Sequence, residues 1–366
     1  MSKEIDIIIP AYKAHNTIKK TLSSIACQTI VNKIMVTIIN DCCPEGDYQD
    51  IIKTFSSLID IKEIKLSKNS GPGVARQYGI DHTKCPYIMF VDADDLLNGG
   101  LVCEQMLYEI KTADTNVIFT GFTEVSKENY YLAHQSDIIW VFGKIYKRKF
   151  LQQNNITFPN LRACEDSCFN HKIVLWHQQH QLDIPALNCN TYIWLHRANS
   201  ITSINGNQYT YDQCVCGLID GLIDVINWMV TQNMPIEMIK EQIYIDMAIL
   251  YISYCTAGIS PEIFQAQNLE YIKKFYNTTW VKYGLTYQDK MFVESYQKVM
   301  DDYVLRLGTD LTIFLAQPNI KDFMDMLSNL PYDPNDIYEI QFNMPEDVKR
   351  NNIECGVCDK DYYKEK

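Results

Sequence analysis

Four consecutive residues, Asp92-Ala93-Asp94-Asp95, carry three carboxylates and directly follow the apolar run at residues 87–91. A strand that ends on carboxylates places them at the carboxyl edge of a buried sheet, where open α/β folds bind their ligands. Hard cations such as Mg²⁺ or Mn²⁺ take oxygen ligands and commonly bridge carboxylates to the phosphates of a nucleotide. The segment therefore predicts a divalent-cation site, and a solvated turn is the alternative for such a motif on its own.

Three further segments predict the elements that would position these carboxylates. Residues 3–10 and 36–41 are apolar runs rich in isoleucine, and the second run also ends on an acid. Residues 16–26 between them have apolar side chains at helical spacing, so the order strand, helix, strand favours a parallel pair. Residues 69–79 then predict a tight glycine turn that opens a short helix, whose N-terminus favours negative charge.

The order and spacing of these motifs resemble the nucleotide-sugar domain of the family 2 glycosyltransferases, which have the GT-A fold. The motifs that carry the resemblance are Pro10-Ala11-Tyr12, Asn40-Asp41, Asn69-x-Gly71 with Ala75-Arg76-x-x-Gly79, and Asp92-x-Asp94-Asp95. Further matches follow in the same order at residues 143–151, 156–159, 165–170 and 196–202. The resemblance covers residues 1–205 and implies an α/β fold of the GT-A type, Rossmann-like, with a mostly parallel sheet flanked by helices.

We expect three parts in the chain, and the first two follow from this resemblance. Residues 1–100 correspond to the nucleotide-sugar-binding half of the GT-A domain, and residues 101–205 to the acceptor-binding half with the catalytic base. Residues 206–366 match no family, but their apolar spacing predicts an α-helical C-terminal module with helices near 218–229, 239–250, 261–276, 289–307 and 320–330. Helical appendages of this kind serve acceptor binding or oligomerisation, and the sequence leaves both open.

For the donor, the resemblance implies roles for residues at the ends of the predicted strands. Asp41 would accept a hydrogen bond from the base, Arg76 would lie near the base or the diphosphate, and Asp92 would hold the ribose. Asp94, together with Asp92, would bind the Mn²⁺ or Mg²⁺ ion that bridges the two phosphates. The other residues implied in donor binding are Pro10, Tyr12, Asn69, Gly71, Ala93, His196 and Arg197.

Two features leave parts of this donor site open. The family's second strand usually ends in D-D-G-S or N-D-G-S, whereas here Asn40-Asp41 is followed by Cys42-Cys43-Pro44-Glu45-Gly46. The loop beside the base therefore differs, and a preference for uracil follows less directly than the fold. His196 and Arg197 suit the neutralisation of a diphosphate, since arginine matches phosphate by its forked geometry. They suit the end of an amphipathic strand equally well.

The same resemblance implies that Asp166 is the general base. It would take the proton from the acceptor as this group attacks the anomeric carbon from the face opposite the diphosphate, and a single displacement of this kind inverts the anomeric configuration. Glu165 is expected to orient the site, because adjacent residues on an extended segment point to opposite sides. The alternative for Asp166 is an N-cap on a helix over residues 167–176.

The composition is typical of a globular protein. The 366 residues are 47% hydrophobic, and the net charge of −12 disfavours general adhesion to nucleic acid or anionic lipid. The sequence has no uninterrupted run of about 18 apolar residues, so it predicts no membrane span. Residues 1–10 lack a signal-peptide pattern. The 13 cysteines show no disulfide-scaffold spacing and predict a reducing, cytoplasmic compartment. Cys355 and Cys358 form a lone C-x-x-C without the partner pair that a zinc site needs.

The leading functional hypothesis is an inverting, metal-assisted glycosyltransferase that uses a nucleoside-diphosphate sugar, with uridine as the nucleoside. Its expected acceptor is a hydroxyl group of a glycan or surface polymer. A viral type of enzyme that glycosylates a hydroxymethylated base in DNA is the alternative acceptor class, although phosphate contacts would need local Lys and Arg against the acidic balance. A non-catalytic nucleotide-sugar-binding protein is the alternative outside enzymes, and the presence of Asp92, Asp94 and Asp166 together argues against it.

Overall fold

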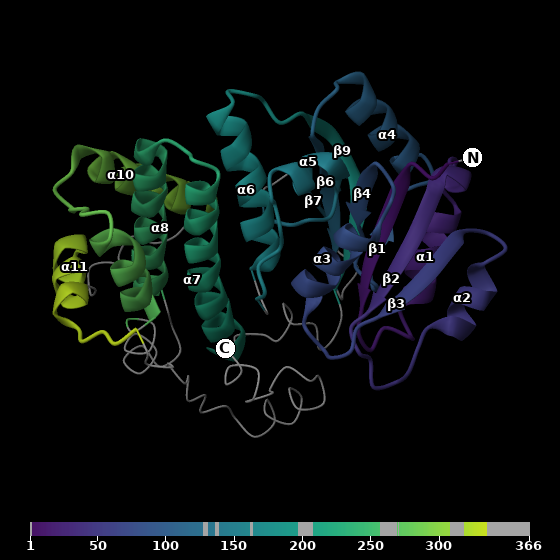
Figure 1. Ribbon diagram of the computed structural model, residues 1–366, viewed down its shortest axis with the longest axis horizontal. Coiled ribbons are helices and arrows are strands. Elements are labelled where there is room, and N and C mark those ends of the chain that lie inside the picture. Colours follow the sequence, from purple (N-terminus) through teal and green to yellow (C-terminus); the bar gives the residue numbers. More distant parts are fainter. Residues whose placement is uncertain are drawn as a thin grey trace. The chain divides into compact units, whose positions relative to one another are not determined.

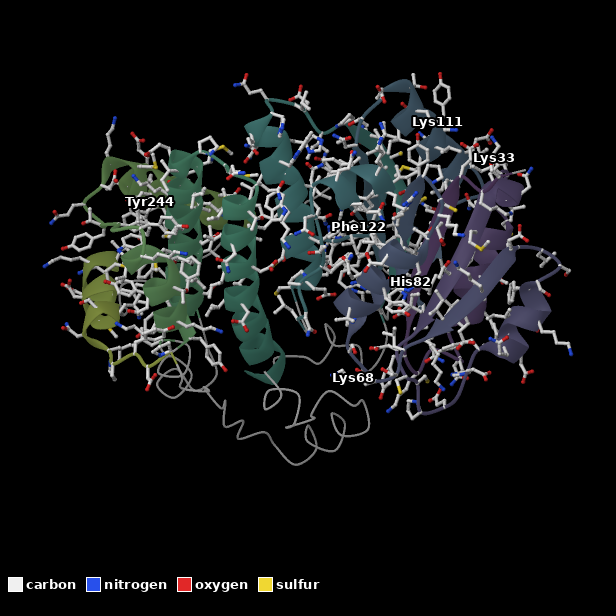
Figure 2. The ribbon with its side chains drawn as sticks, viewed as in Figure 1. Lys33, Lys68, His82, Lys111, Phe122 and Tyr244 are labelled. Carbon is white, nitrogen blue, oxygen red and sulfur yellow. The ribbon has the colours of Figure 1, made fainter. Side chains whose placement is uncertain are left out.

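The computed structural model describes residues 2–126, 131–135, 139–161, 164–196, 208–256, 269, 271–307 and 318–334. The chain forms two compact units, Met1–Ala198 and Asn199–Lys366. In Figure 2, Phe122 marks the first unit and Tyr244 the second. The predicted boundary between residues 205 and 206 lies outside the described residues, and the roles given to the three parts of the chain stay predictions.

One sheet of nine strands forms the centre of the first unit (Figure 1). Its order is β3-β2-β1-β4-β8-β6-β9-β5, and β7 pairs with β6. The strands are β1 (Ile5–Ala11), β2 (Ile34–Asn40), β3 (Asp60–Lys65), β4 (Tyr87–Phe90), β5 (Leu96–Leu97), β6 (Val117–Val125), β7 (Tyr131–His134), β8 (Lys144–Lys147) and β9 (Ala186–Leu195). The first four strands pair in parallel, as do β6 and β9, whereas β5, β7 and β8 pair antiparallel. The sheet is therefore mixed, and its parallel part carries the motifs that are predicted to bind the donor.

Helices cover both faces of this sheet. They are α1 (Ile18–Ala26), α2 (Gln49–Phe55), α3 (Pro72–His82), α4 (Val102–Thr112), α5 (Arg148–Gln153) and α6 (Glu165–Gln179), with a short 3-10 helix at Val31–Lys33. Successive side chains of a strand point to opposite faces. Accordingly, Ile7 and Ile9 of β1 join the core that α1 and α4 cover, while Ile8 lies against Gly79 of α3. All three isoleucines are fully buried, which explains why β1 is apolar at consecutive positions.

The second unit is helical. It contains α7 (Gln208–Thr231), α8 (Ile236–Thr256), a π-helical segment (Tyr276–Val281), α10 (Lys290–Leu307) and α11 (Ile320–Asn329). α8 packs against α7 and α10, and its side chains Ile243, Met247 and Leu250 are fully buried. The apolar spacing of this region therefore reflects a packed helical core, as the sequence predicted.

Four of the five predicted helical stretches coincide with α7, α8, α10 and α11. The fifth, at residues 261–276, falls largely outside the described residues, as do Cys355 and Cys358. In the part of the chain that the structure describes, no helix combines the length and the apolar character needed to cross a membrane.

Candidate active site

Parallel pairing of β1, β2 and β4 brings the predicted donor residues to one edge of the sheet. Pro10 and Tyr12 lie at the carboxyl end of β1, Asp41 directly follows β2, and Asp92 comes two residues after β4. Pro10, Tyr12 and Asp92 are half-buried, whereas Asp41 is buried. The structure thus gathers at one edge residues that are up to about eighty positions apart in the sequence, as open α/β sheets do around their ligands.

Asp41 holds the loop that precedes α3. Its Oδ1 accepts the backbone N–H of Ser70 at 2.7 Å, and its Oδ2 accepts that of Gly71 at 2.8 Å. Gly71 has a φ of 89°, which glycine adopts easily, and Pro72 then begins the helix. Asn69 is half-buried in the same loop. The carboxylate of Asp41 therefore shapes the glycine turn, and its contact with a base stays a prediction.

Tyr192 of β9 holds the acidic turn after β4. Its hydroxyl accepts the backbone N–H of Asp92 at 3.1 Å and donates to Asp95 Oδ2 at 2.8 Å. The other oxygen of Asp95 accepts the N–H of Leu195 at 2.9 Å. Asp95 is buried. This burial, together with the charges of Asp94 and Asp92, raises the pKa of Asp95 well above its ordinary value. Asp92 and Asp94 remain half-buried, while Ala93 between them is buried.

Arg76 of α3 connects the acidic turn to the helix that carries the predicted base. Its Nη2 donates to Asp92 Oδ1 at 2.7 Å, and its Nη1 donates to Glu165 Oε1 at 2.8 Å. The Arg76 side chain is only 5% exposed. Such burial lowers the pKa of an arginine, but the facing carboxylates outweigh it and raise the pKa of Arg76 above its ordinary value. Arg76 Nε has no hydrogen-bond partner among the described residues.

Two glycines let α3 approach its neighbours closely. A Cβ added to Gly73 would lie 2.7 Å from Glu165 Cγ, and one added to Gly79 would lie 2.5 Å from Ile8 Cγ2. Both distances are shorter than a packed interior allows. Gly73 therefore fixes how closely α3 packs against α6, and Gly79 how closely it packs against β1.

Glu165 and Asp166 form the first turn of α6, so the prediction that they lie on an extended segment is wrong. The helix begins after Cys164, whose φ of 64° is left-handed, and it extends beyond the predicted range of 167–176. Asp166 Oδ1 accepts the N–H of Ser167 at 2.9 Å. The aspartate thus supports the helix start from inside the helix, not as its N-cap.

Burial raises the pKa of both carboxyl groups at this helix start. For Glu165 the neighbouring charge of Asp166 adds to the effect of burial, while Arg76 opposes it. For Asp166 burial is the largest cause and raises the pKa. Arg76 lowers this pKa, and the charge of Asp92 raises it. Glu165 is buried and Asp166 is half-buried. Both carboxyl groups therefore bind protons more tightly than usual, and of the two Asp166 is the one that is partly exposed to solvent.

His196 lies directly after β9, and its ring is close to Glu124 of β6. Its Nε2 lies 2.7 Å from Glu124 Oε1, and His134 Nε2 lies 2.7 Å from the other oxygen of the same carboxylate. The backbone N–H of His196 donates to the Val125 carbonyl at 3.0 Å. The structure thus gives His196 the strand-end position of the alternative interpretation. Arg197 lies outside the described residues, and the contact of both with a diphosphate stays a prediction.

Comparison with known proteins identifies the domain that holds this site. Residues 6–170 match the family described as glycosyl transferase family 2. The chain carries a family 2 glycosyltransferase domain. This family domain includes Asp41, Arg76, Asp92 and Asp166, whereas His196 lies beyond its match.

Similar proteins of known name are bacterial glycosyltransferases. The poly(ribitol-phosphate) beta-N-acetylglucosaminyltransferase TarS of Staphylococcus aureus is 27% identical over 189 residues, which are 47% of this chain and 32% of that protein. Glycosyltransferase GlyA of Streptococcus pneumoniae is 22% identical over 263 residues, 64% of this chain and 36% of that protein. A poly(ribitol-phosphate) beta-glucosyltransferase of Bacillus spizizenii is 27% identical over 185 residues, 45% of this chain and 28% of that protein. The chain thus spans about a third of the length of these relatives.

Solved structures of Staphylococcus aureus TarS residues 1–349 share the fold. The complex with UDP gives a TM-score of 0.59 at 18% identity, and the match covers 84% of this chain and 93% of that one. The complex with UDP-GlcNAc gives a TM-score of 0.60 at 17% identity with the same coverage. At this identity the likeness concerns the fold alone. It confirms the predicted GT-A fold with a helical C-terminal region.

Proposed function

We propose that this protein is an inverting glycosyltransferase that moves a sugar from a UDP-sugar to a hydroxyl group of a surface polymer or glycan. The observation that carries the proposal is the Arg76 bridge between Asp92 and Glu165, at 2.7 and 2.8 Å. It ties the acidic turn at the donor edge to the helix start where Asp166 lies. A carboxylate site for a diphosphate sugar and a candidate base are thereby fixed relative to each other, which a transfer reaction requires.

At the donor edge, Asp92 and Asp94 are the carboxylates that fit a divalent cation. Both are half-buried, and an all-oxygen donor set suits Mn²⁺ or Mg²⁺. Asp95 does not fit this role, because both of its oxygens accept hydrogen bonds from the protein interior. A cation bound here would offset the negative charge of the departing diphosphate.

Arg76 offers a second contact for the donor. A buried N–H group without a partner costs about 1–3 kcal/mol, and Arg76 Nε is such a group among the described residues. An oxygen of the bound nucleotide would satisfy it. This supports the predicted position of Arg76 near the donor, in addition to its ion pairs with Asp92 and Glu165.

Asp166 is the proposed general base. Burial raises its pKa, and a raised pKa brings a carboxylate closer to the proton affinity that base catalysis near neutral pH needs. Glu165 Oε1 accepts a hydrogen bond from Arg76, so Glu165 positions the helix start. Asp166 is then the carboxylate that takes the proton from the acceptor. The raised pKa of Asp166 predicts that activity declines as the pH falls through that pKa, because the base is then protonated.

For the acceptor, the names of two relatives specify poly(ribitol phosphate). They favour a hydroxyl-bearing polymer over a hydroxymethylated base in DNA. Poly(ribitol phosphate) is therefore the first acceptor to test, with the helical unit as the proposed contributor to its binding.

The test compares Asp166→Asn with Asp183→Asn, a matched change at an exposed aspartate beyond the same helix. With a UDP-sugar and the trial acceptor, Asp166→Asn should lower kcat by roughly 10²-fold or more while donor binding persists. Asp183→Asn should act like the wild type. Transfer by Asp166→Asn at the wild-type rate would remove Asp166 from the mechanism.

A further inference from the structure

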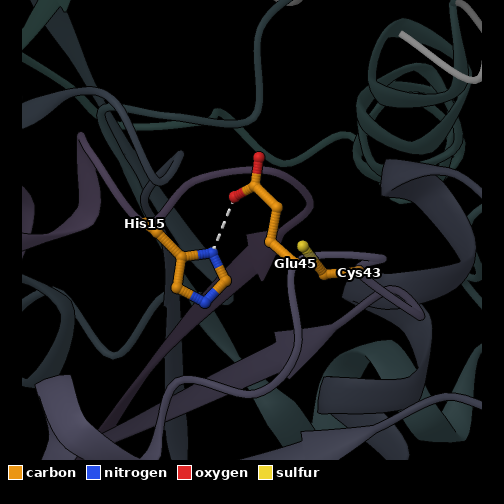
Figure 3. Close-up of side chains that lie close together, drawn as sticks. All are labelled: His15, Cys43 and Glu45. Carbon is orange, nitrogen blue, oxygen red and sulfur yellow. Dashed lines mark hydrogen bonds and ion pairs between the residues drawn. The ribbon is translucent and has the colours of Figure 1, made fainter. Parts of the chain in front are cut away.

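A second cluster of metal-ligand side chains lies at the same edge of the sheet, on the loop that departs from the family pattern. It joins His15, from the loop after β1, to Cys43 and Glu45, from the loop after β2 (Figure 3). One ligand atom of each residue lies within 4.8 Å of the others. Cys43 is buried, while the His15 side chain is 25% exposed and that of Glu45 is 49% exposed. The cluster therefore has a buried sulfur and open access from solvent.

The hydrogen bonds of the His15 ring show which nitrogen faces the cluster. Nε2 lies 2.8 Å from the backbone carbonyl oxygen of Asp47. A carbonyl only accepts, so Nε2 carries the hydrogen. Nδ1 faces Glu45 Oε2 at 3.0 Å, and in a neutral ring both of these atoms present lone pairs. A proton held between the two side chains or a metal ion would satisfy both lone pairs.

Surroundings of the cluster match those of metal ligands in proteins. A ligating histidine commonly donates its other N–H to a backbone carbonyl, which fixes the tautomer, as Asp47 does here for His15. The Cys43 sulfur accepts the backbone N–H of Lys13 at 3.2 Å. The proton alone would explain the pairing of His15 with Glu45, whereas a metal ion would also engage the sulfur of Cys43 beside them.

Both loops are held in place before any ligand binds. The His15 ring stacks on Tyr48 with centroids 4.2 Å apart, and the buried Tyr48 hydroxyl accepts the N–H of Ala14 at 3.2 Å. The N–H of Cys43 donates to Asn40 Oδ1 at 2.8 Å. Ligands fixed by such contacts lose little freedom when an ion binds.

We propose that His15, Cys43 and Glu45 bind a Zn²⁺ ion that cross-links the loop after β1 to the loop after β2. One nitrogen, one sulfur and one oxygen ligand suit Zn²⁺, with a water molecule in the fourth position. They do not suit Mg²⁺ or Mn²⁺, which prefer oxygen alone. This site is distinct from the Asp92 and Asp94 carboxylates. Because Cys43 is two residues from Asp41, the ion would stabilise the segment that shapes the glycine turn.

The test uses the whole chain, purified and stripped of metal, and titrates it with Co²⁺ and then with Zn²⁺. The wild type should give the absorption of a tetrahedral, thiolate-bound Co²⁺, and Zn²⁺ should displace it. Zn²⁺ should also raise the Tm of the apo-protein. Cys43→Ser should lose the thiolate band and one equivalent of bound metal, and Glu45→Gln should weaken Zn²⁺ binding by at least the roughly 10- to 100-fold known for outer-shell partners.

Cys42→Ser is the matched control, since it removes the neighbouring thiol and should leave the band and the stoichiometry unchanged. This comparison separates the proposed site from binding at the other cysteines of the chain. Glu45→Gln changes an exposed side chain and keeps the test valid if Cys43→Ser does not fold. Absence of a thiolate band in the wild type would overturn the proposal and leave a proton between His15 and Glu45. A band that survives Cys43→Ser, or that disappears with Cys42→Ser, would overturn it as well.

Discussion

Replacement of Arg76 by methionine tests whether its ion pairs hold the site together. The change keeps much of the side-chain volume but removes both charge-assisted bonds, to Asp92 and to Glu165. Glu165 is buried and would be left without its cation. At an alkaline pH, where Glu165 is ionised, breaking a buried pair by removing one partner costs about 3–5 kcal/mol. For a unit of this size that corresponds to a fall in Tm of roughly 6–20 °C.

The pH dependence of this loss distinguishes an uncompensated carboxylate from a packing defect. Burial holds the folded-state pKa of Glu165 above its ordinary value of 4.5, at about 8, and Arg76 lowers it. Without Arg76 that pKa rises further, so the folded variant binds protons more tightly than the unfolded chain. Stability of the variant should therefore fall as the pH rises from 4.5 toward 8 and above, and the difference from the wild type should be largest at the alkaline end.

Thermal and urea unfolding of the wild type, Arg76→Met and Arg76→Lys across this pH range would measure the effect. Arg76→Lys keeps the charge but lacks the fork that reaches two carboxylates, so it should lie between the other two. The reasoning would be refuted by an Arg76→Met variant within about 1 kcal/mol of the wild type at alkaline pH, since a buried unpaired charge costs more than that. A destabilisation that grows as the pH falls would refute it too.

Two further changes probe the acidic turn. A chelator should abolish transfer, and Mn²⁺ or Mg²⁺ should restore it. Asp94→Ala should resist this rescue because a metal ligand is lost. Undiminished transfer in excess chelator would mean that cationic side chains of the protein stabilise the leaving group instead. Tyr192→Phe should destabilise the fold by about 1.5–3 kcal/mol, because the buried Asp95 loses a hydrogen bond. Tyr131→Phe, at a tyrosine that is 74% exposed, should change the Tm by little, and an equal effect of both changes would remove the special role of Tyr192.

The sequence predicted which residues gather at the carboxyl edge of the parallel strands, because its information there is local. Each of Asp41 and Asp92 follows an apolar run, and parallel strands bring such strand ends together. Helical spacing in the C-terminal unit likewise predicts α8 and α10, since a helix buries one face at a fixed period. These elements depend on residues close to one another in the chain.

What the sequence missed depends on contacts between distant residues. Tyr192 reaches Asp95 across 97 positions, and no pattern around either residue predicts the pairing of β5 with β9. The start of α6 was misplaced for another reason. Its N-cap position is held by Cys164 in a left-handed conformation, whereas helix starts are recognised in sequence by Ser, Thr, Asp or Asn. The cluster of His15 with Cys43 and Glu45 also became visible only when the structure brought two loops together.

One transfer assay tests the central claim most directly. The purified protein is incubated with UDP-GlcNAc or with UDP-glucose, in the presence of Mn²⁺ and poly(ribitol phosphate). The measured quantity is UDP release together with sugar incorporated into the polymer. We predict that at least one donor is consumed, that sugar appears on the polymer, and that Asp166→Asn suppresses both while Asp183→Asn does not. Binding of the UDP-sugars without any turnover, by a protein whose Asp166→Asn variant behaves identically, would contradict the claim that this domain is a working transferase.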